Sequence, residues 1–219
     1  MIIIIMTSSA KASATHAAPR RRHPRSIATV QALNAAAREL LKEKSVQELS
    51  IVDLCSRIGM STGAFYSSFE SKEAFFEALQ CSACEARVPE FDELRKELDN
   101  ASLSLDDICE RFVRYVVNHA RRDHGLLRAS LLHKPANRED HWQPFRELGT
   151  RYKETLVRKL APHLQHLPAR ARNLRIRFAN QVIFSLIIHA VLNRPGPLAL
   201  EDEAFIVQTS LMVIAYLQA

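Results

Sequence analysis

Glycine is scarce in this chain, which has only five glycines in 219 residues. The sequence has no GxGxxG or GxxxxGK[ST] phosphate loop and no GxSxG nucleophile elbow, which excludes nucleotide-binding and hydrolase sites of those types. Alternating β-branched residues are also scarce, so the sequence does not predict strands. No apolar run reaches the roughly 18 residues that a transmembrane helix needs. These absences predict a cytoplasmic, all-α protein with no membrane partner.

Cysteine is limited to four residues, two of which form the CxxC motif Cys81–Cys84. The motif falls in the middle of a predicted helix, where residues i and i+3 share a face but fit disulfide geometry poorly. A zinc site would need two more ligands, and the sequence contains no second CxxC and no HxxxH. We therefore expect these thiols to pack in the core, and we expect neither a metal nor a cofactor. A redox-sensing regulator that uses Cys81 and Cys84 stays open as an alternative.

Basic residues gather near the N-terminus of a chain whose net charge is +6. Residues 11–25 hold five Lys and Arg and no acidic residue, so the rest of the chain is close to neutral. Residues 1–25 lack a helical apolar stripe and are expected to form a disordered basic arm. Such an arm is either a solvated tail or a segment that follows DNA phosphates and enters a minor groove. We favour DNA binding by four of its cations, Arg20, Arg21, Arg22 and Arg25.

A helix-turn-helix pattern occupies residues 50–76. An apolar stripe at positions i, i+3 and i+7 follows the potential cap Ser50. Gly59 can adopt the left-handed conformation that a tight turn needs, and Ser61 can cap the next helix. A helix that projects from such a unit can enter a DNA major groove.

The segment IGMSTGAFYSSFESKE at residues 58–73 resembles the most recurrent segment of the TetR family of transcriptional regulators. Residues 50–55 and the apolar positions of residues 30–40 are similar to that family's second and first helices. The resemblance implies a homodimeric, ligand-responsive regulator, most simply a repressor that leaves a palindromic operator when a small-molecule effector binds. It also implies phosphate contacts from Ser50, Tyr66 and Lys72, which position a protein on DNA without reading its sequence.

The recognition helix is predicted over Thr62–Phe69 and contains no Lys or Arg. Bidentate readout of guanine from this helix is therefore excluded, and hydroxyl and methyl groups must meet the bases. Phe65 and Phe69 are expected in the core. Outside the arm, the residues assigned to DNA are Ser50, Ser61, Thr62, Gly63, Ala64, Tyr66, Ser67, Ser68 and Lys72.

Two folded domains with about nine helices are predicted. Residues 26–72 form the three-helix DNA-binding domain, and residues 73–219 form a helical domain for effector binding and dimerisation. The helix that starts after Ser71 joins the two domains without a linker, and Pro89 is expected to end or kink it. The last two helices are apolar over broad faces, so they are expected to pair with the same helices of a second copy. A monomeric core that buries both helices is the alternative.

The resemblance also implies an effector pocket among the middle helices of the C-terminal domain. Because ligand pockets are mainly apolar with a few polar groups, a lipophilic small molecule is the expected effector. The candidate lining residues are Phe112, Tyr115, His119, Trp142, Phe145, Tyr152, Gln181 and Phe184. An all-helical enzyme and a protein-binding scaffold, each with an incidental helix-turn-helix, stay open as alternatives. The missing nucleophile motifs argue against the enzyme.

Overall fold

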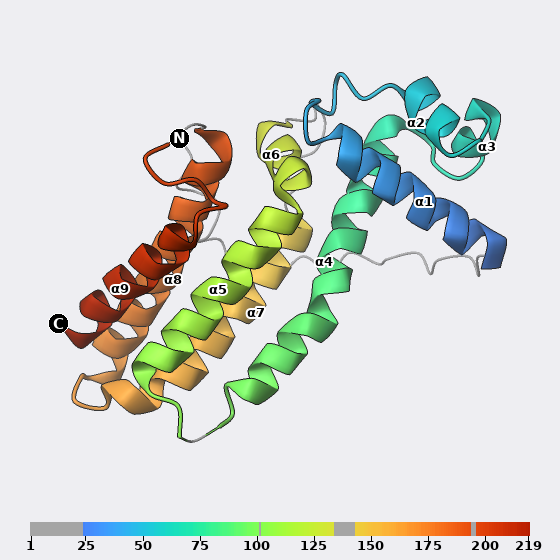
Figure 1. The fold of residues 1–219 in the computed structure, drawn as a ribbon. Coiled ribbons are helices and arrows are strands. Elements are labelled where there is room, and N and C mark those ends of the chain that lie inside the picture. Colours follow the sequence, from blue (N-terminus) through green and yellow to red (C-terminus); the bar gives the residue numbers. More distant parts are fainter. Residues whose placement is uncertain (1–23, 101, 134–142, 194–195) are drawn as a thin grey trace.

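The computed structural model of the protein describes residues 24–100, 102–133, 143–193 and 196–219. Within these ranges the regular structure is entirely helical (Figure 1), which confirms the predicted all-α class and the expected nine helices. The α-helices are α1 (Pro24–Leu40), α2 (Ile51–Arg57), α3 (Thr62–Tyr66), α4 (Lys72–Glu97), α5 (Leu105–Arg122), α6 (His124–Leu132), α7 (Gln143–Leu160), α8 (Ala169–Leu192) and α9 (Glu203–Gln218). A short 3-10 helix, Ala161–Leu164, follows α7.

Helices α1, α2 and α3 share one hydrophobic core with the first half of α4. The rings of Phe65, Phe69 and Phe75 contact one another there, with centroids 5.1–5.5 Å apart. Helices as short as α2 and α3, with 7 and 5 residues, are unstable in isolation. Packing onto α1 and α4 therefore stabilises them, with the aromatic contacts adding to the burial of apolar surface.

Helix α6 packs against the same core, although the sequence did not predict this contact. Leu126 and Ala129 of α6 are buried among the side chains of the DNA-binding domain. At Gly125, a Cβ atom would lie only 2.7 Å from backbone atoms of Leu41 and Lys42 at the end of α1. Such a close approach of two backbones requires a residue without a side chain. The DNA-binding domain therefore packs directly against α6.

Helix α4 connects the two hydrophobic cores of the molecule. Ser71 caps it by accepting a hydrogen bond from the amide of Ala74 at 3.0 Å. Residues up to Ala83 pack in the first core, and Cys84 and Phe91 pack in the second. The helix continues through Pro89 to Glu97, so Pro89 does not end it, and the alternative that Pro89 kinks the helix stays a prediction. Buried side chains on both sides of Pro89 hold the two halves in one continuous helix.

The second core lies among α5, α7, α8 and α9. A capping box starts α5: the Ser104 hydroxyl accepts from the amide of Asp107, and the Asp107 carboxylate accepts from the amide of Ser104. Helix α5 lies beside α9, and α7 lies beside α8. The helix-turn-helix and the α8–α9 pair lie on opposite sides of the molecule (Figure 1).

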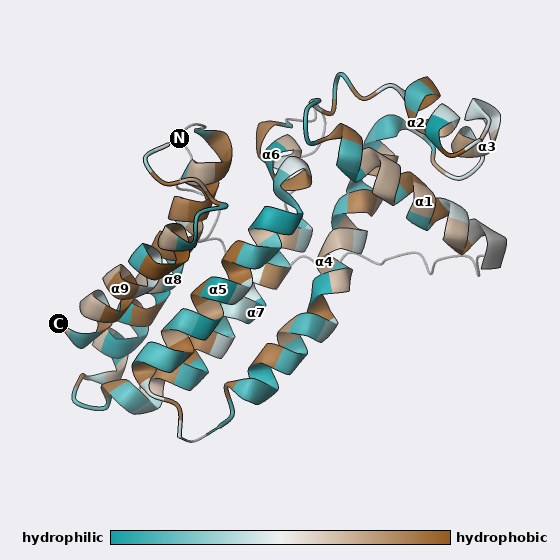
Figure 2. Ribbon diagram, viewed as in Figure 1, coloured by the Kyte–Doolittle hydropathy of each residue, from teal (hydrophilic) through white to brown (hydrophobic). Residues whose placement is uncertain are grey.

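Apolar side chains stay exposed on α8 and α9, two helices that carry many hydrophobic residues (Figure 2). The exposed apolar side chains of this α8–α9 face are Leu174, Phe178, Val207, Leu211, Met212 and Tyr216. Leu174 is 68% exposed and Leu211 is 55% exposed. Leu174 and Phe178 are four residues apart, as are Val207 and Leu211, so each of these pairs lies on one side of its helix. Met212 and Tyr216 are also four apart, and Met212 directly follows Leu211, so the face on α9 is broad. A single chain therefore does not bury both helices, contrary to the monomeric alternative.

Candidate DNA interface and effector region

Two serine caps and one glycine shape the helix-turn-helix. The Ser50 hydroxyl accepts from the amide of Asp53, and the Ser61 hydroxyl accepts from the amide of Ala64, each at 3.2 Å. Gly59 has a φ of +66°, in the left-handed region where a side chain would be strained. These local features agree with the predicted helix-turn-helix.

Helix α3 ends earlier than predicted, at Tyr66 instead of Phe69. The hydroxyls of Ser67 and Ser68 both donate to the carbonyl of Ala64, at 2.8 and 3.2 Å. Serine hydroxyls that bond to nearby carbonyls compete with the helical hydrogen-bond ladder. Because each hydroxyl has only one proton, these two serines can offer DNA only acceptor lone pairs.

The side chains of α3 and its flanks divide into a buried aromatic side and an exposed polar side. Phe65 is 0% exposed and Phe69 is 6% exposed, as expected for core residues. Tyr66 is 54% exposed and packs edge-on against Phe65, with centroids 5.2 Å apart. The other exposed residues assigned to DNA are Ser61, Thr62, Gly63, Ala64, Ser67 and Ser68. The exposed side offers hydroxyls and small side chains to a ligand.

Lys72 and Ser50 lie close together at the start of α2. The Lys72 ammonium donates to the carbonyl oxygens of Gln47 and Leu49, at 2.9 and 3.3 Å. An ammonium has three protons, so one remains for a phosphate. Lys72 thus connects the start of α4 to the loop before α2 by hydrogen bonds. Its contact with DNA stays a prediction.

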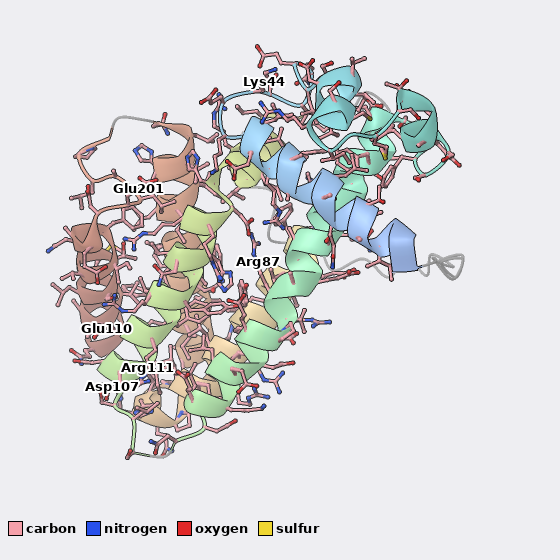
Figure 3. The ribbon with its side chains drawn as sticks, turned by 45° about the vertical axis from the view of Figure 1, so that its right-hand side comes forward. Lys44, Arg87, Asp107, Glu110, Arg111 and Glu201 are labelled. Atoms are coloured by element: carbon pink, nitrogen blue, oxygen red, sulfur yellow. The ribbon has the colours of Figure 1, made fainter. Side chains whose placement is uncertain are left out.

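The basic arm is largely beyond the described ranges. Arg20, Arg21 and Arg22 lie outside the described residues, and of Arg25 only the backbone, in the first turn of α1, is described. Near the helix-turn-helix, Lys44 pairs with Asp53 at 3.5 Å (Figure 3).

Residues 33–79 match the family model of bacterial regulatory proteins, tetR family. The match runs from α1 into α4 and includes the Ser50 and Ser61 caps and Gly59. Residues 33–79 therefore form a DNA-binding domain of the TetR type. No curated protein matches the sequence of this TetR-type chain.

Solved structures resemble the fold of the TetR-type chain over most of its length. A putative TetR-family regulator from Mesorhizobium loti has a TM-score of 0.68 at 15% identity, covering 90% of this chain and 98% of that chain. The fatty acid degradation regulator FadR from Bacillus halodurans has a TM-score of 0.64 at 18% identity, with coverages of 89% and 97%. FadR from Bacillus subtilis, solved in complex with stearoyl-CoA, has a TM-score of 0.59 at 17% identity, with coverages of 85% and 96%. At these identities the likeness shows the fold alone.

Several predicted effector residues of this TetR-type chain gather in one aromatic cluster inside the C-terminal domain. Tyr152 lies at its centre, with ring centroids 6.0 Å from Phe112, 5.9 Å from Tyr115 and 6.0 Å from Phe184. The ring centroid of Phe91 in α4 lies 4.6 Å from that of Tyr152. Phe91 was not predicted as an effector residue, because it follows the proline where the helix was expected to end or kink.

The other predicted effector residues lie in different places. Phe145 of α7 packs against the same core as the cluster. Gln181 is an exposed position on α8, and Trp142 lies outside the described residues. The structure therefore brings together four residues of the predicted set, Phe112, Tyr115, Tyr152 and Phe184, and leaves Gln181 at the surface.

A cavity of about 510 Å³ borders the cluster through Tyr115, within the range of roughly 300–1,000 Å³ typical of ligand pockets. Its lining residues are Glu90, Tyr115, Asn118, His119, Arg121 and Arg122. Only Tyr115 and His119 were predicted, and their rings lie 4.2 Å apart. The remaining four are polar or charged. They were missed because the prediction looked mainly for aromatic residues.

A buried ion-pair network joins the cavity region to the DNA-binding domain. Asp123, which is 8% exposed, accepts from Arg38 of α1 with one oxygen and from Arg87 of α4, at 2.5 Å, with the other. The Tyr115 hydroxyl donates to the carbonyl of Arg87 at 3.2 Å. Figure 3 shows Arg87 between α4 and α5. One carboxylate thus holds together α1, α4 and the junction of α5 with α6.

Burial, followed by the nearby guanidinium groups of Arg122 and Arg87, lowers the pKa of His119 to about 4, while Glu90 and Asp123 act in the opposite direction. An unfolded histidine takes up a proton near pH 6.5, whereas folded His119 does so only near pH 4. The stability that depends on neutral His119 is therefore complete above pH 6.5 and is lost as the pH falls toward 4.

Wild-type protein is expected to lose up to about 2 kcal/mol of its free energy of unfolding between pH 7 and pH 5 through His119. The His119→Gln variant is expected not to show this part of the loss, because glutamine takes up no proton. Urea unfolding at several pH values measures this slope for both proteins. Identical slopes for wild type and variant would show that His119 does not titrate between the two states.

The four cysteines are free thiols, and Cys55, Cys84 and Cys109 are buried. Burial raises the pKa of Cys84 to about 11, and burial followed by the charges of Glu85 and Glu77 raises the pKa of Cys81. Thiols need the thiolate form to react, so these environments argue against redox sensing. In the described ranges, His, Cys, Asp and Glu nowhere form a group of three that could hold a metal ion.

Proposed function

We propose that this chain is a ligand-responsive transcriptional repressor that binds a palindromic operator as a homodimer and is released by a small-molecule effector. The observation that carries the proposal is the exposed polar side of α3 in a domain of the TetR family. In this proposal residues 26–72 bind DNA, residues 73–219 bind the effector and dimerise, and the protein acts in the cytoplasm, where its operator is.

Residues of the helix-turn-helix divide between positioning and reading in this proposal. Ser50, Tyr66 and Lys72 contact phosphates, which fixes the register of the protein on the duplex. The exposed Thr62, Gly63, Ala64 and Ser67 of α3 and its flank meet base edges. In a dimer the two α3 helices would lie in successive major grooves, roughly 34–36 Å apart.

Selection of bound DNA from a random pool tests the proposal most directly. The full chain is expected to enrich a palindrome, and a chain that lacks residues 1–22 is expected to enrich the same palindrome with lower affinity. The plot of log affinity against log salt should flatten by about 0.9 for each phosphate that the arm neutralises in the full chain. Failure of the full chain to enrich any sequence would reject the proposed function. An unchanged salt slope would reject only the role of Arg20, Arg21 and Arg22.

The α8–α9 face supports the proposed homodimer. Exposed apolar side chains on two adjacent helices are costly to leave in water and would be buried by the same face of a second copy. This pairing forms a four-helix bundle and leaves the helix-turn-helix, on the opposite side of the molecule, free for DNA (Figure 1).

Replacing Leu211 with glutamate is expected to convert the dimer to a monomer, because the change puts a charge in the centre of the proposed interface. Light scattering after size-exclusion chromatography measures the mass. Leu132→Glu is the matched control, since Leu132 is 52% exposed but lies on α6, away from the α8–α9 face. A Leu211→Glu protein that stays dimeric would place the interface elsewhere.

By length and composition, α8 is also apolar enough to cross a membrane. Core helices of water-soluble proteins pass the same test. Ile176, Ile183 and Ile187 of α8 are at most 3% exposed, in contact with the second core, which favours a core helix with one side in the dimer interface.

The aromatic cluster and the adjacent cavity are the proposed effector site. The resemblance in fold to a FadR protein solved with stearoyl-CoA supports a small-molecule effector for this chain as well. An effector that binds one arrangement of the α1–α4–α6 junction more tightly than another would change the position of the DNA-binding domain. Neither an enzyme nor a protein-binding scaffold accounts for the TetR-type domain, so we favour the regulator over both.

A further inference from the structure

The cavity lined by Glu90, Tyr115, Asn118, His119, Arg121 and Arg122 has an excess of positive charge in its surroundings. Arg38 and Arg87 share the single carboxylate of Asp123. Arg122 pairs with Glu90 at 2.5 Å. Arg121 donates to the carbonyl oxygens of Leu200 and Asp202, at 2.6 and 2.9 Å, so its charge is met by neutral groups.

The carboxylate that pairs with Arg121 does not remove this excess. Glu203 lies 3.9 Å from Arg121 and is already paired with Arg114 at 2.5 Å. Arg121 and Arg114 thus share one carboxylate, and a bound anion would supply Arg121 with a counterion of its own.

Arg87 does not line the cavity, but it is bonded to the lining residue Tyr115 and adds a second observation. Arg87 is only 8% exposed as a whole residue, and its Nε is buried with no hydrogen-bond partner within the described part of the chain. Buried N–H groups are nearly always paired, so an unpaired one indicates a missing acceptor. Tyr115, which lines the cavity, is bonded to the carbonyl of the same residue.

Tyr115 also gives the cavity an apolar side. Its ring lies 5.7 Å from Phe91 and 5.9 Å from Tyr152, so the phenol forms the boundary between the charged cavity and the aromatic cluster. A ligand in the cavity can therefore place an aromatic body against Tyr115 and a charged group among the arginines. The cavity, at about 510 Å³, has room for a molecule of that kind.

We propose that this cavity binds an organic acid, with its carboxylate held by Arg122 and Arg121 and its apolar or aromatic body against Tyr115. The proposal rests on the proposed function, because it names the chemical class of the effector. It departs from the lipophilic effector that the sequence predicted, since the lining residues are mostly polar. Glu90 competes with the ligand for Arg122 and is displaced from it when the acid binds.

Calorimetric titration of the full chain with three probes tests the proposal. The probes are 2-naphthoate, the uncharged 2-naphthamide of the same shape, and inorganic phosphate, which lacks an apolar body. We expect 2-naphthoate to bind at least tenfold more tightly than either of the others. Equal binding of the amide would overturn the role of charge, equal binding of phosphate would overturn the role of the apolar body, and no binding of naphthoate would overturn the whole proposal.

Three variants locate the site. Arg122→Gln is expected to weaken naphthoate binding about tenfold, whereas Arg111→Gln should leave it within twofold. Arg111 is a matched control because it lies on the same helix and is about as exposed as Arg122. It lies near the opposite end of α5 (Figure 3) and pairs with Glu97. Glu90→Gln is expected to strengthen binding several-fold, because it releases Arg122 from its competitor. A misfolded protein does not gain affinity, so unchanged or weaker binding by Glu90→Gln, or equal losses for the two arginine variants, would contradict the site.

Operator binding separates this proposal from the proposed function. It is measured without any acid present, so a chain that binds its palindrome but not naphthoate would refute only the class of effector. A chain that binds naphthoate but selects no DNA would refute only the repressor.

Discussion

Replacing Asp123 with asparagine is expected to lower the free energy of unfolding by about 3–5 kcal/mol. The carboxylate is 8% exposed and is shared by Arg38 and Arg87. Without it, Arg87, whose side chain is 10% exposed, keeps a buried charge with no counterion. Arg38 is 32% exposed and stays partly hydrated, so most of the loss arises at Arg87. Chemical denaturation at neutral pH measures the difference.

Asp92→Asn is the matched control for this change. Asp92 pairs with Arg95 at 3.0 Å, but both side chains are nearly half exposed, and surface pairs contribute at most about 1 kcal/mol. Adding Arg87→Met to the Asp123→Asn protein is expected to restore part of the stability, because an apolar side chain needs no counterion. Similar losses for Asp123→Asn and Asp92→Asn would show that the network is effectively hydrated.

Replacing Gly125 with alanine is expected to cost about 3 kcal/mol, near the upper end of the range for overpacked interiors. The new Cβ would lie 2.7 Å from the carbonyl group of Leu41 and from the amide nitrogen of Lys42. Backbone atoms cannot rotate away as a flexible side chain can, so α1 and α6 must separate. Because α1 belongs to the DNA-binding domain, we expect operator affinity to fall together with the midpoint of thermal unfolding.

Gly149→Ala is a control in which the same substitution is expected to raise the free energy of unfolding instead of lowering it. Gly149 lies inside α7, and a Cβ there would meet no atom within 4 Å. Alanine in a helix interior is favoured over glycine by roughly 0.5–1 kcal/mol, so this variant should be more stable than wild type. If the two variants shifted stability in the same direction, the close contact of α6 with α1 would be refuted.

Local signals in the sequence were reliable where short-range chemistry decides the structure. Ser50, Ser61 and Ser71 cap the helices that they were expected to cap, and Gly59 adopts its left-handed turn. The predicted length of α3 failed for a local reason as well, because Ser67 and Ser68 bond back to Ala64. That competition depends on side-chain rotamers, which residue types alone do not specify.

Long-range contacts were beyond prediction from a single sequence. Nothing near Asp123 in the chain indicates Arg38, 85 residues earlier, or Arg87, 36 residues earlier, as its partners. Phe91 was likewise assigned to no site, although it lies against Tyr152 in the aromatic cluster. Such pairs are made by the packing of whole helices, and helical periodicity shows which side of a helix is buried but not which helix covers it.

The sequence by itself determined the helices, their serine caps, the helix-turn-helix and the family of the DNA-binding domain, because these depend on residues within a few turns of one another. Only the tertiary structure decided which charges meet. It placed Asp123 between the two domains, set Gly125 against α1 and left arginines around a cavity with too few carboxylates. Electrostatic and steric contacts between helices depend on distances in space, which the order of residues along the chain does not give.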